Sequence, residues 1–346
     1  MQRFNVSLTL ATLALLLSPL AWSQTPSALA LASNPSAPDL SMARGEDLFV
    51  NAGLTLEPHA VLKRTGAGVT AFILDTGIRE DHSEFSGRVL PGFSVINDGK
   101  GTTDCNGHGT HVAGIVGGRL YGVAKQVMLV PVRVMDCAGV GTVSGLISAL
   151  EWVGNTKQRP AVANVSMGGA ASSALNTAIA ALVAKGVTVV VAAGNKGIDA
   201  CKASPASAPN VISVGATNKE GALARYSNFG PCVNIFAPGF EVTSAWHTSD
   251  SATKTLSGTS MASPSVAGLA ALALETVPEA SPLDVVTFLV DHARHSRVAE
   301  SATNVPTGLL AWMSSALSAS ADSQTLALKA MATMSAAPGA RTQQVR

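Results

Sequence analysis

The chain has 346 residues, of which 47% are hydrophobic and 13% charged, and its formal net charge is +1. This length suffices for one large α/β domain with extensions at its ends. The near-neutral charge offers no basic face, so nucleic acid is excluded as an expected partner.

The amino-terminal 23 residues have the parts of a secretory signal peptide. Arg3 lies in a short polar region, an apolar run extends to Leu17, and the small residues Ala21 and Ser23 precede a cleavage site at Gln24. The alternative of an uncleaved membrane anchor is less favoured, because the apolar run is shorter than a spanning helix requires. We therefore expect a secreted protein, extracellular or periplasmic, that is soluble and monomeric after cleavage.

The two segments that flank the central part of the chain have a biased composition. Residues 24–45 are rich in Ser, Pro and Ala and predict a flexible leader or a short pro-segment. Residues 319–346 predict a low-complexity tail. One folded domain is expected between them, over residues 46–318.

Within this domain, short β-branched apolar runs alternate with segments of helical length. The expected strands lie in GVTAFILDTG, QVMLVPVRVM, AVANVSMGG, GVTVVVAAGN and NVISVGAT, and helices are expected near 108–117, 142–157, 173–185 and 260–277. Continuous apolar runs are typical of strands that are buried on both faces of a parallel sheet. The alternation predicts a three-layer, doubly wound α/β fold with a central, mostly parallel sheet, whose sites lie beyond the carboxyl ends of the strands.

Polar residues stand at these strand ends and at two helix starts. Asp75 and Asn195 each follow a strand, His108 and His111 lie in DCNGHGTHVAG, and Ser260 begins a helix. Each has a simpler interpretation on its own: a turn residue for Asp75 or Asn195, a helix cap for His108 or Ser260. An aspartic protease is also disfavoured, because the Asp-Thr-Gly sequence occurs once and that chemistry needs two carboxylates.

Together these residues supply the parts of nucleophilic catalysis by serine. A serine hydroxyl needs a histidine to take its proton, and a carboxylate must hold the imidazole. The free N–H groups at a helix start, aided by an amide side chain, can stabilise a tetrahedral oxyanion. The residues alone leave the choice between His108 and His111 open.

Four segments, ILDTGI, NGHGTHVAG, AAGN and SGTSMASP, resemble the signature segments of the subtilase family, in the same order, over residues 66–318. The resemblance implies a subtilisin-like peptidase domain and a serine endopeptidase that acts through an acyl-enzyme. It makes Asp75 the orienting acid, His108 the general base, Ser260 the nucleophile and Asn195 the oxyanion donor. The alternatives are a catalytically silent subtilase fold that serves as a binding or scaffold protein, and an esterase of another fold.

The closest resemblance within that family is to the proteinase K group, in DCNGHGTHVAGIVGG and VPVRVMDCAGVGTVSG. It pairs Cys105 with Cys137 and Cys201 with Cys232. It also implies that protein or peptide substrates bind as an added strand. The implied substrate-binding residues are Gly139, Val140, Gly141, Ser166, Met167 and Gly168, with the pocket for the residue before the scissile bond (P1) lined by Gly168, Gly169, Ala192, Ala193 and Gly194. These walls are small and uncharged, so an apolar P1 side chain is expected.

The chain departs from the family pattern at three points, of which one, Ser265 in place of a family His, is expected to have no catalytic cost. Asn234 stands where the family has a calcium-binding Asp, beside backbone ligands expected from Pro209 and Val211, so the affinity of a structural calcium site is in doubt. The chemistry itself requires no cofactor. The segment before the domain is shorter than the prodomain of related enzymes. Either the protein folds without a prodomain, or a separate inhibitor or folding chaperone serves in its place, or the true start of the chain lies upstream.

Overall fold

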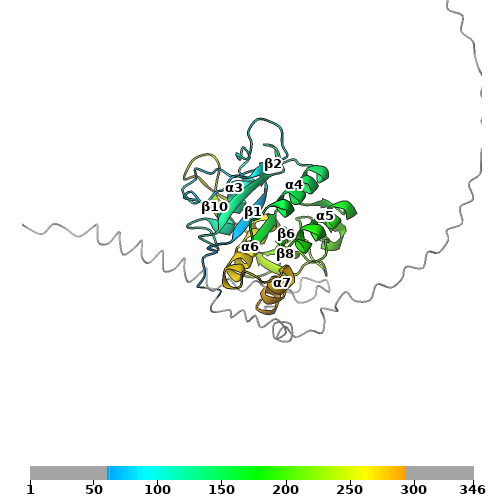
Figure 1. Ribbon diagram of the computed structural model, residues 1–346. Coiled ribbons are helices and arrows are strands. Elements are labelled where there is room, and N and C mark those ends of the chain that lie inside the picture. Colours follow the sequence, from blue (N-terminus) through cyan, green and yellow to red (C-terminus); the bar gives the residue numbers. More distant parts are fainter. Residues whose placement is uncertain (1–60, 62, 294–346) are drawn as a thin grey trace, which may run out of the picture. The chain divides into compact units, whose positions relative to one another are not determined.

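The computed structural model describes residue 61 and residues 63–293 (Figure 1). The predictions for the signal peptide, the leader and the tail lie outside the described residues, as do the two ends of the expected 46–318 domain. No helix in the described part of the chain is long and apolar enough to cross a membrane.

A seven-stranded sheet forms the centre of the domain, and all of its strand pairings are parallel. Its order is β2-β3-β1-β4-β6-β8-β9. The strands are β1 (Thr70–Asp75), β2 (Phe93–Ser94), β3 (Met128–Arg133), β4 (Ala161–Val165), β6 (Thr188–Ala192), β8 (Ile212–Thr217) and β9 (Ile235–Pro238). The order reverses between β1 and β4, which is where sites form in such sheets.

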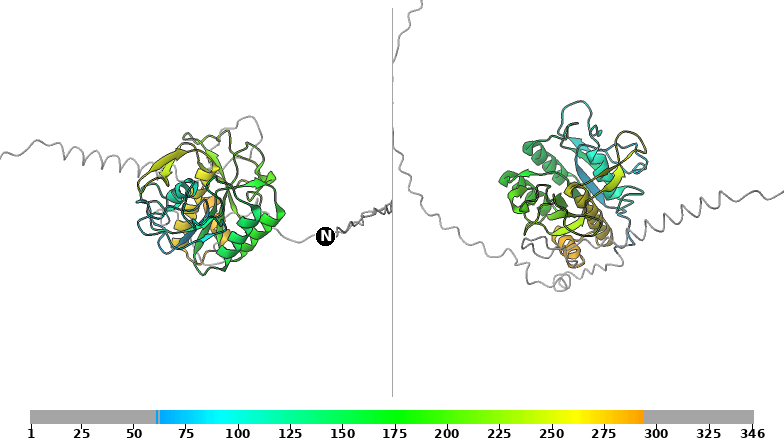
Figure 2. Two further views of the ribbon diagram at one scale, coloured as in Figure 1. Left: turned by 90° about the horizontal axis from the view of Figure 1, so that it is seen from above. Right: turned by 180° about the vertical axis from the view of Figure 1, so that it is seen from behind.

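Helices cover both faces of this sheet, as the sequence predicts (Figures 1 and 2). The cluster on one face includes residues of α3 (His108–Gly117), α6 (Thr259–Thr276) and α7 (Pro282–Asp291). The cluster on the other face includes α4 (Val143–Asn155) and α5 (Ser173–Ala184). The three-layer α/β fold is thereby confirmed. Neither the strands β2 and β9, of two and four residues, nor the helix α7 was predicted from the sequence. The start of α7 has a recognisable signal, the capping box of Ser281 and Asp284.

Three small elements complete the described chain. β5 (Gly169–Ala170) pairs antiparallel with β7 (Ala203–Ser204), and the 3₁₀ turn η1 (Ala200–Lys202) precedes β7. The hairpin of β10 (Val242–Ala245) and β11 (Thr253–Leu256) is the third element. β10 packs against α3, since Ser244 Oγ donates to the carbonyl of His111 at 2.8 Å.

Two disulfides have the pairing that the resemblance implied. Cys105 is bonded to Cys137 and Cys201 to Cys232, across sequence separations of 32 and 31 residues. The first bond joins the loop before α3 to the loop after β3. The second joins η1 to the segment before β9.

We predict that replacing either cysteine pair by serine lowers the free energy of unfolding by about 3 kcal/mol, because each bond closes a loop of about 30 residues in the unfolded chain. Denaturant unfolding of the two double variants and of the wild type measures this loss. Mass mapping of the unreduced wild type is the control. Free thiols at all four positions would contradict the pairing.

Candidate active site

The carboxylate of Asp75 and the imidazole of His108 form the most direct pairing in the site. Asp75 ends β1 and is 0% exposed, and His108 is the first residue of α3. The distances from His108 Nδ1 to Asp75 Oδ1 and Oδ2 are 2.8 and 2.9 Å, and Thr76 N–H donates to Oδ1 at 2.8 Å. Because the carboxylate accepts a hydrogen bond from Nδ1–H, the lone pair of the neutral ring lies at Nε2.

The surroundings of His108 shift its basicity. Burial by itself lowers the pKa, but the charge and hydrogen bond of Asp75, with a smaller contribution from the charge of Asp104, outweigh burial and raise the pKa of His108 above its ordinary value. The ring is therefore a stronger base than a free histidine.

A close approach of α3 to β1 makes this pairing fit. A Cβ atom at Gly109 would lie 3.1 Å from both Gly77 N and Thr76 N, and it would also clash with the Gly77 carbonyl. Glycine at 109 therefore allows the first turn of α3 to rest on the end of β1. Gly109 N–H also donates to Thr76 Oγ1 at 2.9 Å.

A second buried carboxylate, Asp104, organises the loop that carries His108. Its Oδ1 accepts from Thr76 Oγ1 at 2.9 Å, from Asn106 N at 2.9 Å and from Gly107 N at 2.8 Å. Its Oδ2 accepts from Thr110 N at 2.9 Å and from Thr110 Oγ1 at 2.6 Å. Asp104 thus ties β1, the loop and the first turn of α3 together. It was not predicted from the sequence, because it lies three residues before the N-cap Gly107, outside the position where a capping Asp is expected.

His111, the alternative histidine, has a different environment. It is 0% exposed and its Nε2 lies 2.9 Å from the carbonyl oxygen of Lys254 in β11. Burial lowers the pKa of His111 to about 4, so the ring is neutral at ordinary pH. The geometry therefore selects His108 as the partner of Asp75, as the resemblance implied.

Ser260 lies in the first turn of α6 and is hydrogen-bonded to Ser166, the residue that follows β4. Ser260 Oγ donates to the Ser166 carbonyl and Ser166 Oγ donates to the Ser260 carbonyl, both at 3.1 Å. The second bond is available because Pro264, four residues after Ser260, has no N–H to give that carbonyl. Behind it, Ser263 Oγ donates to Asn164 Oδ1, and Asn164 Nδ2 donates to Ser166 Oγ at 2.8 Å.

The two halves of the site lie on adjacent strands. β1 pairs with β4 so that Leu74 is opposite Val165, and Asp75 and Ser166 are the next residues of each chain segment. Adjacent strands are about 4.8 Å apart. In the described structure the Ser260 hydroxyl donates its hydrogen to the Ser166 carbonyl, so it must leave that acceptor before His108 can take the proton.

Asn195 is held so that one end of its amide is free. Thr259 N and Thr259 Oγ1 both donate to Asn195 Oδ1 at 2.8 Å, and Gly194 N donates to Thr259 Oγ1 at 3.1 Å. With Oδ1 engaged, the exposed Asn195 directs its Nδ2 donors away from Thr259. That Thr259 orients the Asn195 side chain was not predicted from the sequence.

A cavity of about 490 Å³ lies beside Ser260 and Asn195. It is lined by all five residues expected for the P1 pocket, Gly168, Gly169, Ala192, Ala193 and Gly194, and by Met167, which was expected in a flanking strand. Lys196 and Lys202 also line it, so the cavity has charged residues beyond the small, uncharged ones that the sequence predicts. Lys202 was missed because only the folded chain brings η1 to this cavity.

The other expected substrate-binding residues lie outside the cavity lining. Gly139, Val140 and Gly141 form a turn after β3, where Gly141 bridges antiparallel to Met135 and Val140 is 63% exposed. Ser166 is buried next to the cavity. Their place in substrate binding therefore stays a prediction.

The expected calcium ligands have a neutral donor set. Asn234 Oδ1 already accepts from Ser213 N at 2.8 Å, and Pro209 and Val211 offer backbone oxygens only. Calcium sites normally include carboxylates, so these residues fit the ion poorly, and no step below depends on it.

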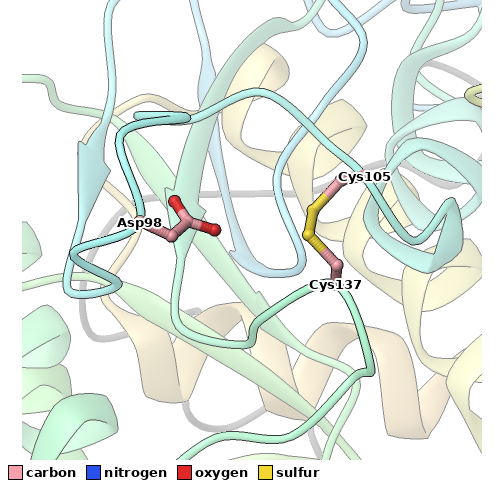
Figure 3. A group of neighbouring side chains, drawn as sticks. All are labelled: Asp98, Cys105 and Cys137. Atoms are coloured by element: carbon pink, nitrogen blue, oxygen red, sulfur yellow. A yellow bond between two sulfur atoms is a disulfide. The ribbon is translucent and has the colours of Figure 1, made fainter.

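One further group has the composition of a metal site, formed by Asp98, Cys105 and Cys137 (Figure 3). Both sulfurs are in the disulfide, and Asp98 is bonded to both terminal nitrogens of the buried Arg133, at 2.7 and 2.6 Å. The Arg133 guanidinium holds the pKa of Asp98 well below its usual range. This group is an ion pair beside a disulfide, with no ligand atoms left for a metal.

The chain belongs to the subtilase family, whose sequence pattern matches residues 66–318. It is 49% identical over 266 residues to an extracellular serine proteinase of Thermus sp. (strain Rt41A), covering 77% of this chain and 65% of that one. It is also 49% identical over 212 residues to a cuticle-degrading serine protease of Arthrobotrys oligospora, covering 60% and 51%. The chain thus spans between half and two thirds of the length of these relatives.

Solved structures agree with this assignment. A cold-adapted subtilisin-like serine proteinase superimposes with a TM-score of 0.69 at 44% identity, over 74% of this chain and 93% of that one. A protease of Pseudoalteromonas arctica PAMC 21717 gives a TM-score of 0.67 at 30% identity, over 76% and 93%.

We predict that Asp104→Asn shifts the acidic limb of the pH profile of kcat/KM to lower pH. Asp104 raises the pKa of His108, so removing its charge lowers the pH at which His108 loses its proton and becomes a base. The variant should also lose about 1–3 kcal/mol of unfolding free energy, because an amide cannot accept all five hydrogen bonds.

Thr110→Val is the matched control. It removes one donor to Asp104 but leaves the carboxylate charge, so the limb should stay near the wild-type pH. An unshifted limb in Asp104→Asn would contradict this electrostatic account.

Proposed function

We propose that the protein is a secreted serine endopeptidase that uses Asp75, His108, Ser260 and Asn195. The observation that carries this proposal is the contact between the buried Asp75, at the end of β1, and His108, at the start of α3. The adjacent strand end holds Ser260 beside a cavity. The relatives named as serine proteinases support it.

The reaction begins when the Ser260 hydroxyl turns from Ser166 toward His108. His108 Nε2 takes the hydroxyl proton while Ser260 Oγ attacks the scissile carbonyl, and Asp75 stabilises the imidazolium that forms. His108 then gives the proton to the leaving amine, which leaves an acyl-enzyme on Ser260. A water molecule, deprotonated by His108, hydrolyses that ester and restores the serine.

The developing oxyanion has two donors in this scheme. The Ser260 N–H lies in the first turn of α6, where backbone N–H groups have no partner within the helix. The second donor is Asn195 Nδ2, whose orientation follows from the two hydrogen bonds that Thr259 gives to Oδ1. Donors that are fixed before the reaction stabilise the charge without reorganisation.

The substrate in this proposal is an extended peptide that adds a strand between residues 139–141 and 166–168. Its P1 side chain enters the cavity, whose walls include Ala192, Ala193 and Gly168. Because these walls are apolar, a large apolar P1 side chain such as Phe or Leu is well accommodated.

The alternative function is a binding or scaffold protein that has the same fold but does not hydrolyse peptide bonds. A fluorophosphonate probe and casein distinguish the two. We expect the probe to label Ser260 and to block casein hydrolysis. A scaffold would show neither effect, and an esterase would be labelled but leave casein intact.

We predict that Asn195→Ala lowers kcat by about 10²–10³-fold with little change in KM, since the lost donor matters more for the oxyanion than for the ground-state carbonyl; the magnitude is that of a related protease. Steady-state kinetics on a peptide anilide measure the change. The variant should still be labelled, though slowly, whereas Ser260→Ala, the control, should show no labelling. Unchanged kcat in Asn195→Ala would make Asn195 a turn residue.

A further inference from the structure

The cavity beside Ser260 is positively charged, which the sequence analysis did not anticipate. Lys196 and Lys202 contribute to its lining, and none of the described residues that line it is Asp or Glu. Both lysines are exposed. The ion pairs found in the described part of the chain involve other residues, so neither ammonium is neutralised within it.

The backbone that carries each lysine is well fixed. Asn228 Oδ1 accepts from Lys196 N at 3.0 Å and from Ile198 N at 3.2 Å, and Asn228 Nδ2 donates to the Ala193 carbonyl at 2.8 Å. The loop that carries Lys196 is therefore fastened to the end of β6. It cannot swing away from the cavity without breaking these bonds.

Lys202 is the last residue of η1 and is fixed in a different way. Its neighbour Cys201 is in the disulfide with Cys232, and Asp199 Oδ1 caps η1 by accepting from Cys201 N at 2.9 Å. Lys202 N also donates to the Asp199 carbonyl at 3.1 Å. Two independent segments thus bring a cation to the same cavity.

We propose that this cavity accepts a P1 glutamate and disfavours P1 lysine and arginine. The methylene groups of glutamate contact the apolar walls, and its carboxylate is attracted by Lys196 and Lys202. A cationic P1 side chain is repelled by the two lysines, and none of the described lining residues is an Asp or Glu that could pair with it. This inference rests on the proposed peptidase function and adds a charge preference to the apolar one.

The expected size of the preference follows from the exposure of the lysines. Ion pairs between exposed groups are weak, so each lysine should change the rate by a factor of about two to five. Salt screens exposed charges, so the preference should shrink at about 1 M ionic strength, where the Debye length is about 3 Å.

Peptide anilides that differ only at P1 test the proposal. We expect wild-type kcat/KM to be several-fold higher for P1 Glu than for its neutral isostere Gln at low salt, and lower for P1 Lys than for P1 Met. The Glu-to-Gln ratio should approach 1 in Lys196→Gln/Lys202→Gln. The Lys-to-Met ratio should rise above 1 in Lys196→Glu/Lys202→Glu. Each ratio is formed within one variant, so a general change in activity cancels.

Lys157→Gln is the matched control, because Lys157 is exposed and precedes β4 at the amino edge of the sheet, away from the cavity. Its ratios should equal those of the wild type. Equal kcat/KM for P1 Glu and P1 Gln in the wild type would overturn the inference. So would Glu-to-Gln and Lys-to-Met ratios that do not change in the double variants. Cleavage of a P1 Phe peptide in the same assays would still uphold the peptidase function. Failure to cut any of the peptides would overturn both.

Discussion

A buried carboxylate at the end of a central strand is the constraint on which the site depends. Asp75 has no exposed surface, and an ionised carboxylate in that position is tolerated only if it is paired and hydrogen-bonded. Its partners are the His108 ring and the Thr76 N–H. The bond to His108 sets the first turn of α3 against the end of β1, and this close approach requires a glycine at 109. The Asp104 carboxylate is also buried, and it accepts five hydrogen bonds. These bonds fix the loop that carries His108.

Ser260, the proposed nucleophile, is positioned in a different way. Side-chain hydrogen bonds hold the start of its helix, α6, to the end of the neighbouring strand β4. Pro264 leaves the Ser260 carbonyl without a helical donor, and Ser166 fills that position. Thr259, one residue before Ser260, orients Asn195. One turn of α6 therefore fixes the proposed nucleophile and the proposed oxyanion donor together, and both line the same cavity.

Much of this arrangement could be predicted from the sequence, because its signals are local. Apolar runs indicated the parallel sheet, and the signature segments pointed to Asp75, His108, Ser260 and Asn195. What escaped prediction depends on contacts between distant segments. The hydroxyl bond from Ser260 to Ser166 requires β4 and α6 to be in place. The charge of the cavity beside Ser260 requires η1 to bring Lys202 to it.

The central claim is that the buried Asp75 carboxylate makes His108 the base that activates Ser260. The most direct test is kcat for Asp75→Asn on a peptide anilide, with circular dichroism to show that the variant is folded. The account predicts that kcat falls about 10⁴-fold, a magnitude borrowed from other serine proteases, because an amide holds the imidazole in the wrong tautomer and cannot stabilise its charged form. A folded variant that kept the wild-type kcat would contradict it.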